Sequence, residues 1–157
     1  MKRLDKENYY LDIAETVAER STCLRRCYGA ILVRNDEIVA TGYNGAPRGR
    51  KNCMDLGRCT REELGIPSGE RYELCRSVHA EANCIISAAR NESLGATLYM
   101  ACRDPQGERI PGSTSCAMCR RLIINAGIER VVIRDTPTEY RVVHVEDWIR
   151  EDDSLEA

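Results

Sequence analysis

Aromatic residues are scarce in this chain, which has no phenylalanine, one tryptophan and seven tyrosines among its 157 residues. An excess of basic side chains is also missing, because the formal net charge at pH 7 is −2. Proteins that bind single-stranded nucleic acid combine a positively charged groove with aromatic side chains on which bases stack. The composition therefore argues against a nucleic-acid partner.

Long apolar runs and a secretory leader are absent as well. No stretch approaches the ~18 apolar residues of a membrane span, and the opening segment, residues 1–6, turns polar early. The nine cysteines are an odd number, which does not suit a disulfide framework. We therefore expect a cytoplasmic protein with no membrane partner, whose thiols serve metal binding. The length predicts a single domain over residues 1–157.

Two short motifs carry the residue types of a catalytic zinc site. The first is His79-Ala80-Glu81, and the second is Cys116-Ala117-Met118-Cys119. One imidazole and two thiolates fill three positions of a tetrahedral Zn²⁺ and leave the fourth for water, as in catalytic rather than closed structural sites. Glu81 is then the carboxylate that moves protons to and from that water.

Each motif is predicted to lie at the start of a helix. Apolar residues recur at helical spacing after Glu81, at Ala82, Ile85, Ile86 and Ala89. Cys116 and Cys119 are three residues apart and so share one face of a helical turn. Free N–H groups and the helix dipole stabilise thiolates at such a position, which lowers the cysteine pKa and favours metal binding.

Either motif alone has a plainer interpretation. A lone C-x-x-C is also typical of a redox pair, half of a structural zinc site or two buried cysteines, and a lone histidine before a helix is usually a cap or a packing residue. In combination, an H-x-E at a helix start and a C-x-x-C after one intervening strand form the pattern that zinc nucleoside deaminases share. The combination predicts deaminase chemistry.

The remaining pattern predicts an α/β fold. An apolar stripe indicates a first helix that ends before Ser21, and two β-rich runs joined across Asn35-Asp36 indicate a hairpin. Further strands are predicted over residues 96–101, 131–133 and 141–145, so that one pair of strands is parallel. The connection between the hairpin and His79 is long, with a short helix around residues 60–64, and connections of this length are usually functional.

The chain resembles the deoxycytidylate deaminase family within the cytidine deaminase superfamily. The likeness runs from about Ser21 to Arg134 and rests on the motifs STC (21–23), YGA (28–30), TGYNGAPRG (41–49), Cys53, GIPSGER (65–71), HAEAN (79–83) and NAGI (125–128). The resemblance implies a three-layer α/β/α fold with a mixed five-stranded sheet, and conversion of deoxycytidylate (dCMP) to deoxyuridylate with loss of ammonia. It also implies a homo-oligomer, a hexamer or a dimer, controlled by deoxycytidine and thymidine triphosphates (dCTP and dTTP).

Two substrate contacts are implied by the same resemblance. The Ala80 backbone is expected to hold the pyrimidine edge, and Asn44 is expected to fix the base and the sugar. From the residues alone, a turn residue with positive φ beside Gly45 is the favoured interpretation of Asn44. Arg48, Arg50 and Lys51 form a basic cluster in the same loop, which suits either a nucleotide phosphate or an ordinary solvated surface.

A second, structural zinc is a further expectation. Cys23 and Cys53 match positions that bind such a zinc in some phage members of the family, and Cys59 and Cys75 lie in the same long connection. Four thiolates would close a tetrahedral site and hold this segment together. The alternative is a set of buried or free thiols.

Three departures from the family pattern leave the substrate open. Ser115 stands where proline is usual, and is expected to cap the second motif helix. Residues 103–114 form an insertion expected near the substrate entrance, and Asn52 replaces a frequent histidine. Another cytosine nucleotide or nucleoside, or another aminated heterocycle, stays an alternative substrate. A nucleic-acid editing deaminase and a non-catalytic zinc-bearing interaction protein are the alternatives from other classes.

Overall fold

The computed structural model of this protein describes residues 1–151, so residues 152–157 of the predicted domain lie outside the described part. Its centre is a mixed five-stranded sheet in the order β2-β1-β3-β4-β5. Only β3 and β4 run parallel, and the other neighbours are antiparallel. The strands are β1 (Cys27–Arg34), β2 (Glu37–Tyr43), β3 (Thr97–Arg103), β4 (Arg130–Arg134) and β5 (Tyr140–His144). The predicted mixed sheet is confirmed.

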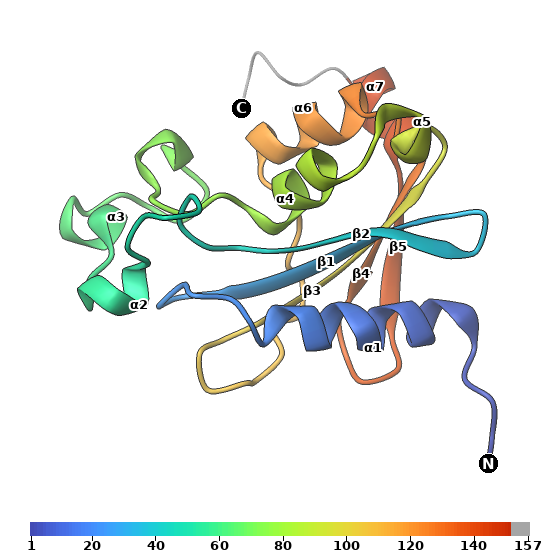
Figure 1. Cartoon of the computed structure of the whole chain (residues 1–157), viewed down its shortest axis with the longest axis horizontal. Helices are drawn as coiled ribbons and strands as arrows, with labels where there is room; N and C mark the ends of the chain where they lie inside the picture. Colours follow the sequence, from blue (N-terminus) through green and yellow to red (C-terminus); the bar gives the residue numbers. More distant parts are fainter. Residues whose placement is uncertain (152–157) are drawn as a thin grey trace.

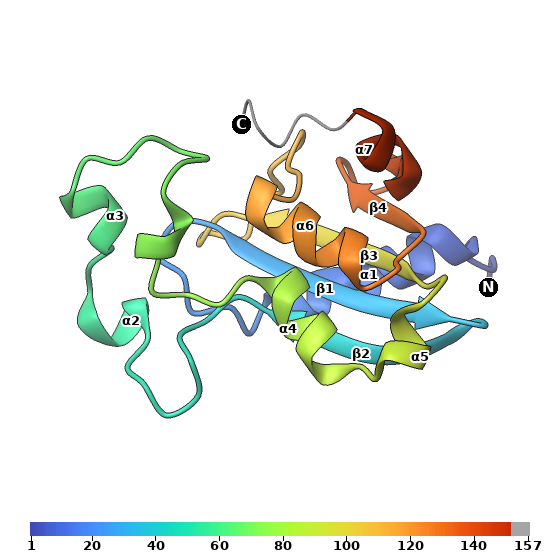
Figure 2. The ribbon, with the colours of Figure 1, turned by 90° about the horizontal axis from the view of Figure 1, so that it is seen from above.

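Helices cover both faces of the sheet, which gives the predicted three layers (Figure 1). Helix α1 packs against one face, and α4 and α6 lie side by side on the other, with α5 and α7 beyond them (Figure 2). The helical elements are α1 (Lys6–Ala18), α2 (Cys53–Leu56), α3 (Thr60–Glu63), the 3-10 helix η1 (Tyr72–Leu74), α4 (Ala80–Ser87), α5 (Arg90–Ser93), α6 (Ala117–Asn125) and α7 (Val145–Glu151). In residues 1–151 no helix has the length and apolar character that crossing a membrane requires.

Alternation along the central strands builds a separate core on each face. Ile31 and Val33 pack with Tyr10 and Leu11 on the α1 side. Their neighbours Ala30 and Leu32 point the other way, into the core shared with α4 and α6. Because β1 is covered on both faces, its sequence is an almost continuous apolar run rather than an alternating one.

Two glycines let helices approach the sheet at backbone distance. A Cβ added at Gly29 would lie 2.1 Å from the Ala14 carbonyl oxygen of α1. A Cβ at Gly42 would lie 2.4 Å from the Ala80 carbonyl oxygen and 2.7 Å from the Cys84 nitrogen of α4. Gly42 therefore fixes how closely the helix that follows His79 rests on β2.

The helix that follows His79 is shorter than the apolar spacing predicted, and it buries a different face. Its buried residues are Ala80, Glu81 and Cys84, whereas Ile86 is 74% exposed. The prediction of an apolar face through Ile86 and Ala89 is therefore wrong. The buried positions of α4 lie one turn apart, and the first of them belong to the H-x-E motif itself.

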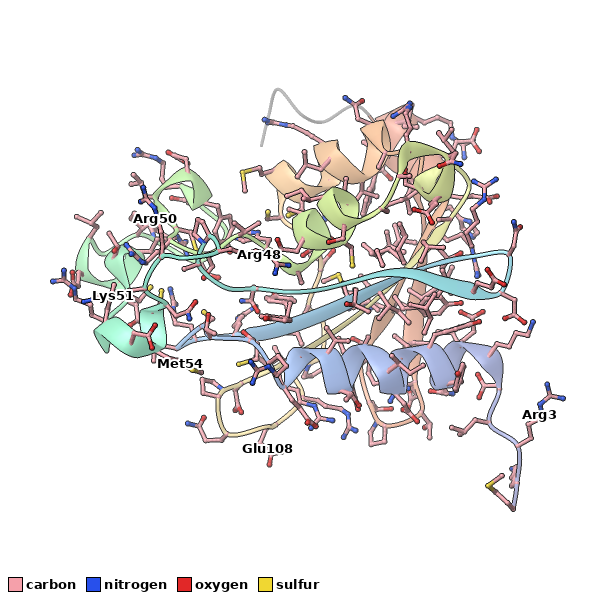
Figure 3. The ribbon with its side chains drawn as sticks, viewed as in Figure 1. Arg3, Arg48, Arg50, Lys51, Met54 and Glu108 are labelled. Carbon is pink, nitrogen blue, oxygen red and sulfur yellow. The ribbon has the colours of Figure 1, made fainter. Side chains whose placement is uncertain are left out.

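The segment from Asn44 to Val78 stands to one side of the sheet and carries α2, α3 and η1 (Figure 2). It is anchored where it leaves and rejoins the body, since Gly45 and Val78 form an antiparallel bridge. The insertion 103–114 extends toward the α1 side, as the position of Glu108 in Figure 3 shows. We call residues 44–78 the side segment below.

Candidate metal centre and catalytic carboxylate

His79 is the N-cap of α4, with an extended backbone (φ −72°, ψ 155°), and the helix begins at Ala80. This break between loop and helix turns His79 and Glu81 toward one point, although they are only two residues apart. Ala80 is 1% exposed and Glu81 is 4% exposed. The motif therefore enters the core at the edge of the sheet.

Cys116 is the N-cap of α6, and its sulfur accepts a hydrogen bond from the Cys119 backbone N–H at 3.5 Å. The prediction that Ser115 caps this helix is therefore wrong by one residue. Ser115 is instead buried, and its hydroxyl donates to the Met100 sulfur at 3.6 Å. Gly127 adopts a positive φ of 75° just after the end of α6, as the sequence predicts.

The structure brings the three predicted zinc ligands together. The His79 Nδ1 atom lies 3.5 Å from the Cys116 sulfur and 3.4 Å from the Cys119 sulfur, and all three donor atoms lie within 4.8 Å of one another. Zinc–sulfur bonds of about 2.3 Å and zinc–nitrogen bonds of about 2.0–2.1 Å at tetrahedral angles place such donors about 3.6 Å apart. The donor set and its spacing fit a zinc ion held through Nδ1 of His79.

The same three groups perturb one another strongly. Burial disfavours the charged imidazole, but hydrogen bonding to Cys116 and Cys75 outweighs it and raises the pKa of His79 to about 10. Hydrogen bonds from Cys119 and His79 lower the pKa of the Cys116 thiol. Hydrogen bonding to Cys116, together with burial, raises the pKa of the Cys119 thiol. Bound metal requires both thiols without their protons and a neutral imidazole, so protons leave this cluster when metal binds.

Glu81 is the buried carboxylate of the site. Burial raises its pKa, and this outweighs the opposing influence of its own backbone N–H and of the nearby Ser115. A carboxyl group with a raised pKa is suited to accepting a proton and giving it back. Glu81 and His79 line one cavity together with Cys116 and Thr114.

Asn44 also lines this cavity, and most of the hydrogen-bonding capacity of its side-chain amide is taken up by neighbouring protein groups. Its Oδ1 accepts from the Ser21 hydroxyl at 2.6 Å and the Tyr28 backbone N–H at 2.9 Å. Its Nδ2 donates to the Arg26 carbonyl oxygen at 2.9 Å, which leaves one N–H unassigned. Asn44 is not one of the described residues with positive φ, so the turn interpretation does not apply. The predicted role of the Ala80 backbone stays a prediction.

The predicted basic cluster lies outside the cavity. Arg48, Arg50 and Lys51 are exposed and lie in the loop before α2 (Figure 3), and none of them is among the lining residues. The cavity is lined instead by Arg25, Arg26 and Arg61, together with Tyr28 and Tyr72 from other segments. None of these five residues is among the predicted site residues. The only available signal was that Arg25 and Arg26 directly follow the family motif at residues 21–23.

The four cysteines of the predicted second zinc site lie in one neighbourhood. Cys23, Cys59 and Cys75 line the cavity, and burial together with the nearness of these thiols raises the pKa of Cys53. Within residues 1–151, however, only His79, Cys116 and Cys119 form a group of three or more metal donors within 4.8 Å. The side segment therefore gathers the cysteines without arranging them as a ligand set.

Comparison with known proteins places this geometry in a family. Residues 4–135 match the family model described as the cytidine and deoxycytidylate deaminase zinc-binding region. The chain belongs to this family. A deoxycytidylate deaminase of Mycobacterium phage D29 is 39% identical over 137 residues, which cover 84% of this chain and 96% of that protein. One from Schizosaccharomyces pombe is 34% identical over 126 residues, which cover 80% of this chain but only 36% of the yeast protein.

Solved structures of the family agree with the fold. The dCMP deaminase of cyanophage S-TIM5, in complex with dCMP and dUMP, is 26% identical with a TM-score of 0.59, and the match covers 98% of this chain and 91% of that one. A cytidine deaminase from Mycobacterium tuberculosis is similar in fold alone, with 20% identity, a TM-score of 0.50 and coverage of 92% and 94%. The family resemblance drawn from the motifs is confirmed.

Proposed function

We propose that this protein is a zinc-dependent hydrolytic deaminase that converts dCMP to dUMP and ammonia. The observation that carries the proposal is the buried Glu81 carboxyl beside three converging zinc donors at the wall of one cavity. Support for dCMP as the substrate comes from the names of the phage and yeast relatives and from the cyanophage structure with dCMP and dUMP.

The chemistry can be assigned to the residues of the chain. His79, Cys116 and Cys119 would hold a zinc ion, which when bound would lower the pKa of water toward ~7 and so supply a nucleophile at neutral pH. Glu81 accepts one proton of the attacking water and donates it to N3 of the cytosine. The water oxygen bonds to C4, the C4–N4 bond breaks, and the second water proton leaves with ammonia. General acid–base transfer of this kind contributes roughly 10² to 10⁴ in rate.

Arg26 is the residue best placed to bind the substrate phosphate. It lines the cavity with an exposed side chain, whereas Arg25 already pairs with Glu62 at 3.0 Å and Arg61 is buried. An arginine guanidinium is charged at neutral pH, and hydrogen bonding to Tyr28 raises the pKa of Arg26 further. For the phosphate contact in this cavity we propose Arg26 in place of Arg48, Arg50 and Lys51, which are not among its lining residues.

Ammonia release from a panel of dCMP, dCTP, deoxycytidine, cytidine and adenosine tests the proposal. We expect the monophosphate to be turned over best. Replacing Arg26 by Gln should raise the KM for dCMP about tenfold, because one charge-assisted hydrogen bond is lost, and should leave deoxycytidine turnover unchanged. Arg48→Gln is the matched control and should behave as wild type. Faster turnover of another compound would identify that compound as the substrate in place of dCMP. No ammonia release from any compound by zinc-loaded protein would favour a non-catalytic role.

A second zinc is proposed at Cys23, Cys53, Cys59 and Cys75. Its support is the shared neighbourhood of the four thiols, and binding would require the side segment to close around the ion. Homo-oligomerisation and control by dCTP and dTTP are further proposals drawn from the family. Sedimentation with and without each triphosphate, combined with the ammonia assay, tests both.

A further inference from the structure

Tyr72 lies directly against the zinc ligand His79. The two ring centroids are 4.9 Å apart and the ring planes meet at 83°, an edge-to-face contact. Torsion about the bond that joins a histidine ring to its Cβ is broad, so an imidazole needs neighbours to fix its plane. Tyr72 supplies such a neighbour from the side segment, on a ring whose Nδ1 faces the two thiols.

Tyr72 is itself held on its ring face and at its hydroxyl. The Arg61 guanidinium carbon lies 4.3 Å from the Tyr72 ring centroid, which is the geometry of a cation–π contact. The Gly69 backbone N–H donates to the Tyr72 hydroxyl at 3.2 Å. These contacts leave Tyr72 little freedom to move away from His79.

Arg61 is an unusual buried cation, because its partners are backbone carbonyls. It is 5% exposed, and its Nη2 donates to the carbonyl oxygens of Pro67 and Glu70 at 2.8 Å each. Its Nε donates to Glu70 again at 3.2 Å. Burying a charge is costly unless it is compensated, so these bonds and the Tyr72 ring are what hold Arg61 in place. Arg61 thereby orders residues 61–72 into one unit.

We propose that Arg61 and Tyr72 are positioning residues for the catalytic zinc, which act by fixing the plane of the His79 imidazole. Neither residue belongs to the H-x-E or C-x-x-C motif, and neither coordinates the metal. The inference deepens the proposed function, since it concerns the same zinc site. Outer-shell partners of metal-ligating histidines typically change metal affinity by 10- to 100-fold when they are removed.

The test compares zinc release to a coloured chelator from the wild-type sequence, Tyr72→Leu and Tyr72→Phe, each carrying Cys59→Ser so that only zinc at the His79 site is followed. The Leu variant should release zinc about 10- to 100-fold faster, and its cobalt-substituted form should show a shifted visible absorption band. The Phe variant keeps the aromatic ring and should release zinc at nearly the wild-type rate. Tyr9→Leu, which removes a half-exposed tyrosine on α1, is the control for tyrosine loss elsewhere and should not change release.

Arg61→Lys provides an independent variant in case Tyr72→Leu does not fold. Lysine keeps the positive charge but lacks the planar guanidinium that donates to the Pro67 and Glu70 carbonyl oxygens. This variant should therefore release zinc several-fold faster than wild type. Wild-type release from folded Tyr72→Leu or Arg61→Lys would overturn the proposal, as would equally fast release from Tyr72→Phe and Tyr72→Leu. These readouts do not depend on turnover, so a wild-type protein that binds zinc but releases no ammonia would contradict only the proposed function.

Discussion

Two regions of this molecule carry metal-binding residue types, and they are built in different ways. At the starts of α4 and α6, His79, Cys116 and Cys119 hold their donor atoms at the spacing that zinc requires. In the side segment and its neighbour Cys23, four cysteines share a neighbourhood without forming a ligand set. The first site is preorganised by helices packed on a sheet, whereas the second would be assembled by the metal itself.

The difference shows what preorganises a metal site. A helix start fixes the backbone at the ligand, and Gly42 fixes the height of α4 above the sheet. The side segment has only four-residue helices and a 3-10 turn to hold its cysteines.

The largest effect is expected from paired cysteine substitutions, one in each region. Cys119→Ser should abolish zinc at the His79 site and bring ammonia release down to background, because a serine hydroxyl is a poor zinc ligand. Cys59→Ser should remove only the second zinc and keep most of the activity. Metal analysis should give two zinc ions per wild-type chain and one per chain in each variant. One zinc in the wild type would refute the second site, and full activity in Cys119→Ser would refute the first.

A pair of glycine substitutions distinguishes an effect on zinc binding from an effect on the stability of the whole fold. Gly42→Ala and Gly29→Ala each force a Cβ against helix backbone and should destabilise the fold by about 1–3 kcal/mol. Only Gly42→Ala presses on α4, so only this variant should also release zinc faster. Thermal unfolding combined with chelator kinetics checks the pair, and equal zinc release from both variants would argue against site-specific support by Gly42.

A substitution of Glu15, on the face of the sheet that α1 covers, should lower the stability of the fold without affecting the zinc site. Glu15 is 6% exposed and accepts from Arg109 Nε at 2.6 Å and Arg103 Nη2 at 2.7 Å. Burial raises its pKa, but these hydrogen bonds outweigh burial, so the folded pKa lies below the ordinary 4.5. A depressed pKa contributes stability that is present above about pH 4.5 and is lost as the pH falls through the folded value.

Glu15→Gln should therefore cost about 2 kcal/mol at pH 7, allowing for the partly exposed arginines, which corresponds to a fall in Tm of about 6 °C. The difference from wild type should shrink as the pH falls below 4.5. Thermal unfolding at pH 7, 5 and 4 measures it. Activity per folded molecule at pH 7 should stay at the wild-type value, and a constant difference across the pH range would contradict the role given to Glu15.

The smallest expected effect concerns the rate of proteolysis. Arg48, Arg50 and Lys51 are exposed in the side segment, so brief trypsin treatment should cut there first. If the second zinc closes this segment, chelator should speed that cut several-fold in wild type and leave it unchanged in Cys59→Ser. Mass spectrometry of the first fragments identifies the site of cleavage. A first cut within the sheet would contradict the view that the side segment is less firmly held than the elements that carry the His79 site.

Short-range features of this fold could be predicted from the sequence. The hairpin at Asn35-Asp36, the two motif helices and the last strand follow from local spacing, and the structure has all of them. The convergence of His79 with Cys116 and Cys119 was predictable because each motif fixes its own ligands at a helix start. The cap of α6 was misplaced by one residue because Cys116 itself accepts the capping hydrogen bond.

The walls of the cavity could not be predicted in the same way. Arg26, Thr114 and Tyr72 come from three separate segments, and only the tertiary fold brings them around Glu81. Of the insertion 103–114, only Thr114 reaches the cavity, because Arg103 and Arg109 turn toward Glu15 on the opposite face. The exposure of Ile86 likewise depends on which neighbours cover α4, and helical periodicity does not contain that information.

The most direct test of the account is ammonia release from dCMP by zinc-loaded wild type and Glu81→Gln, with zinc per chain measured on the same samples. Gln keeps the size of the buried side chain but cannot accept the water proton. We predict equal zinc content and a loss of roughly 10² to 10⁴ in kcat for the variant. Undiminished turnover in Glu81→Gln would contradict the assignment of Glu81 as the proton-transfer group, and with it the proposed mechanism.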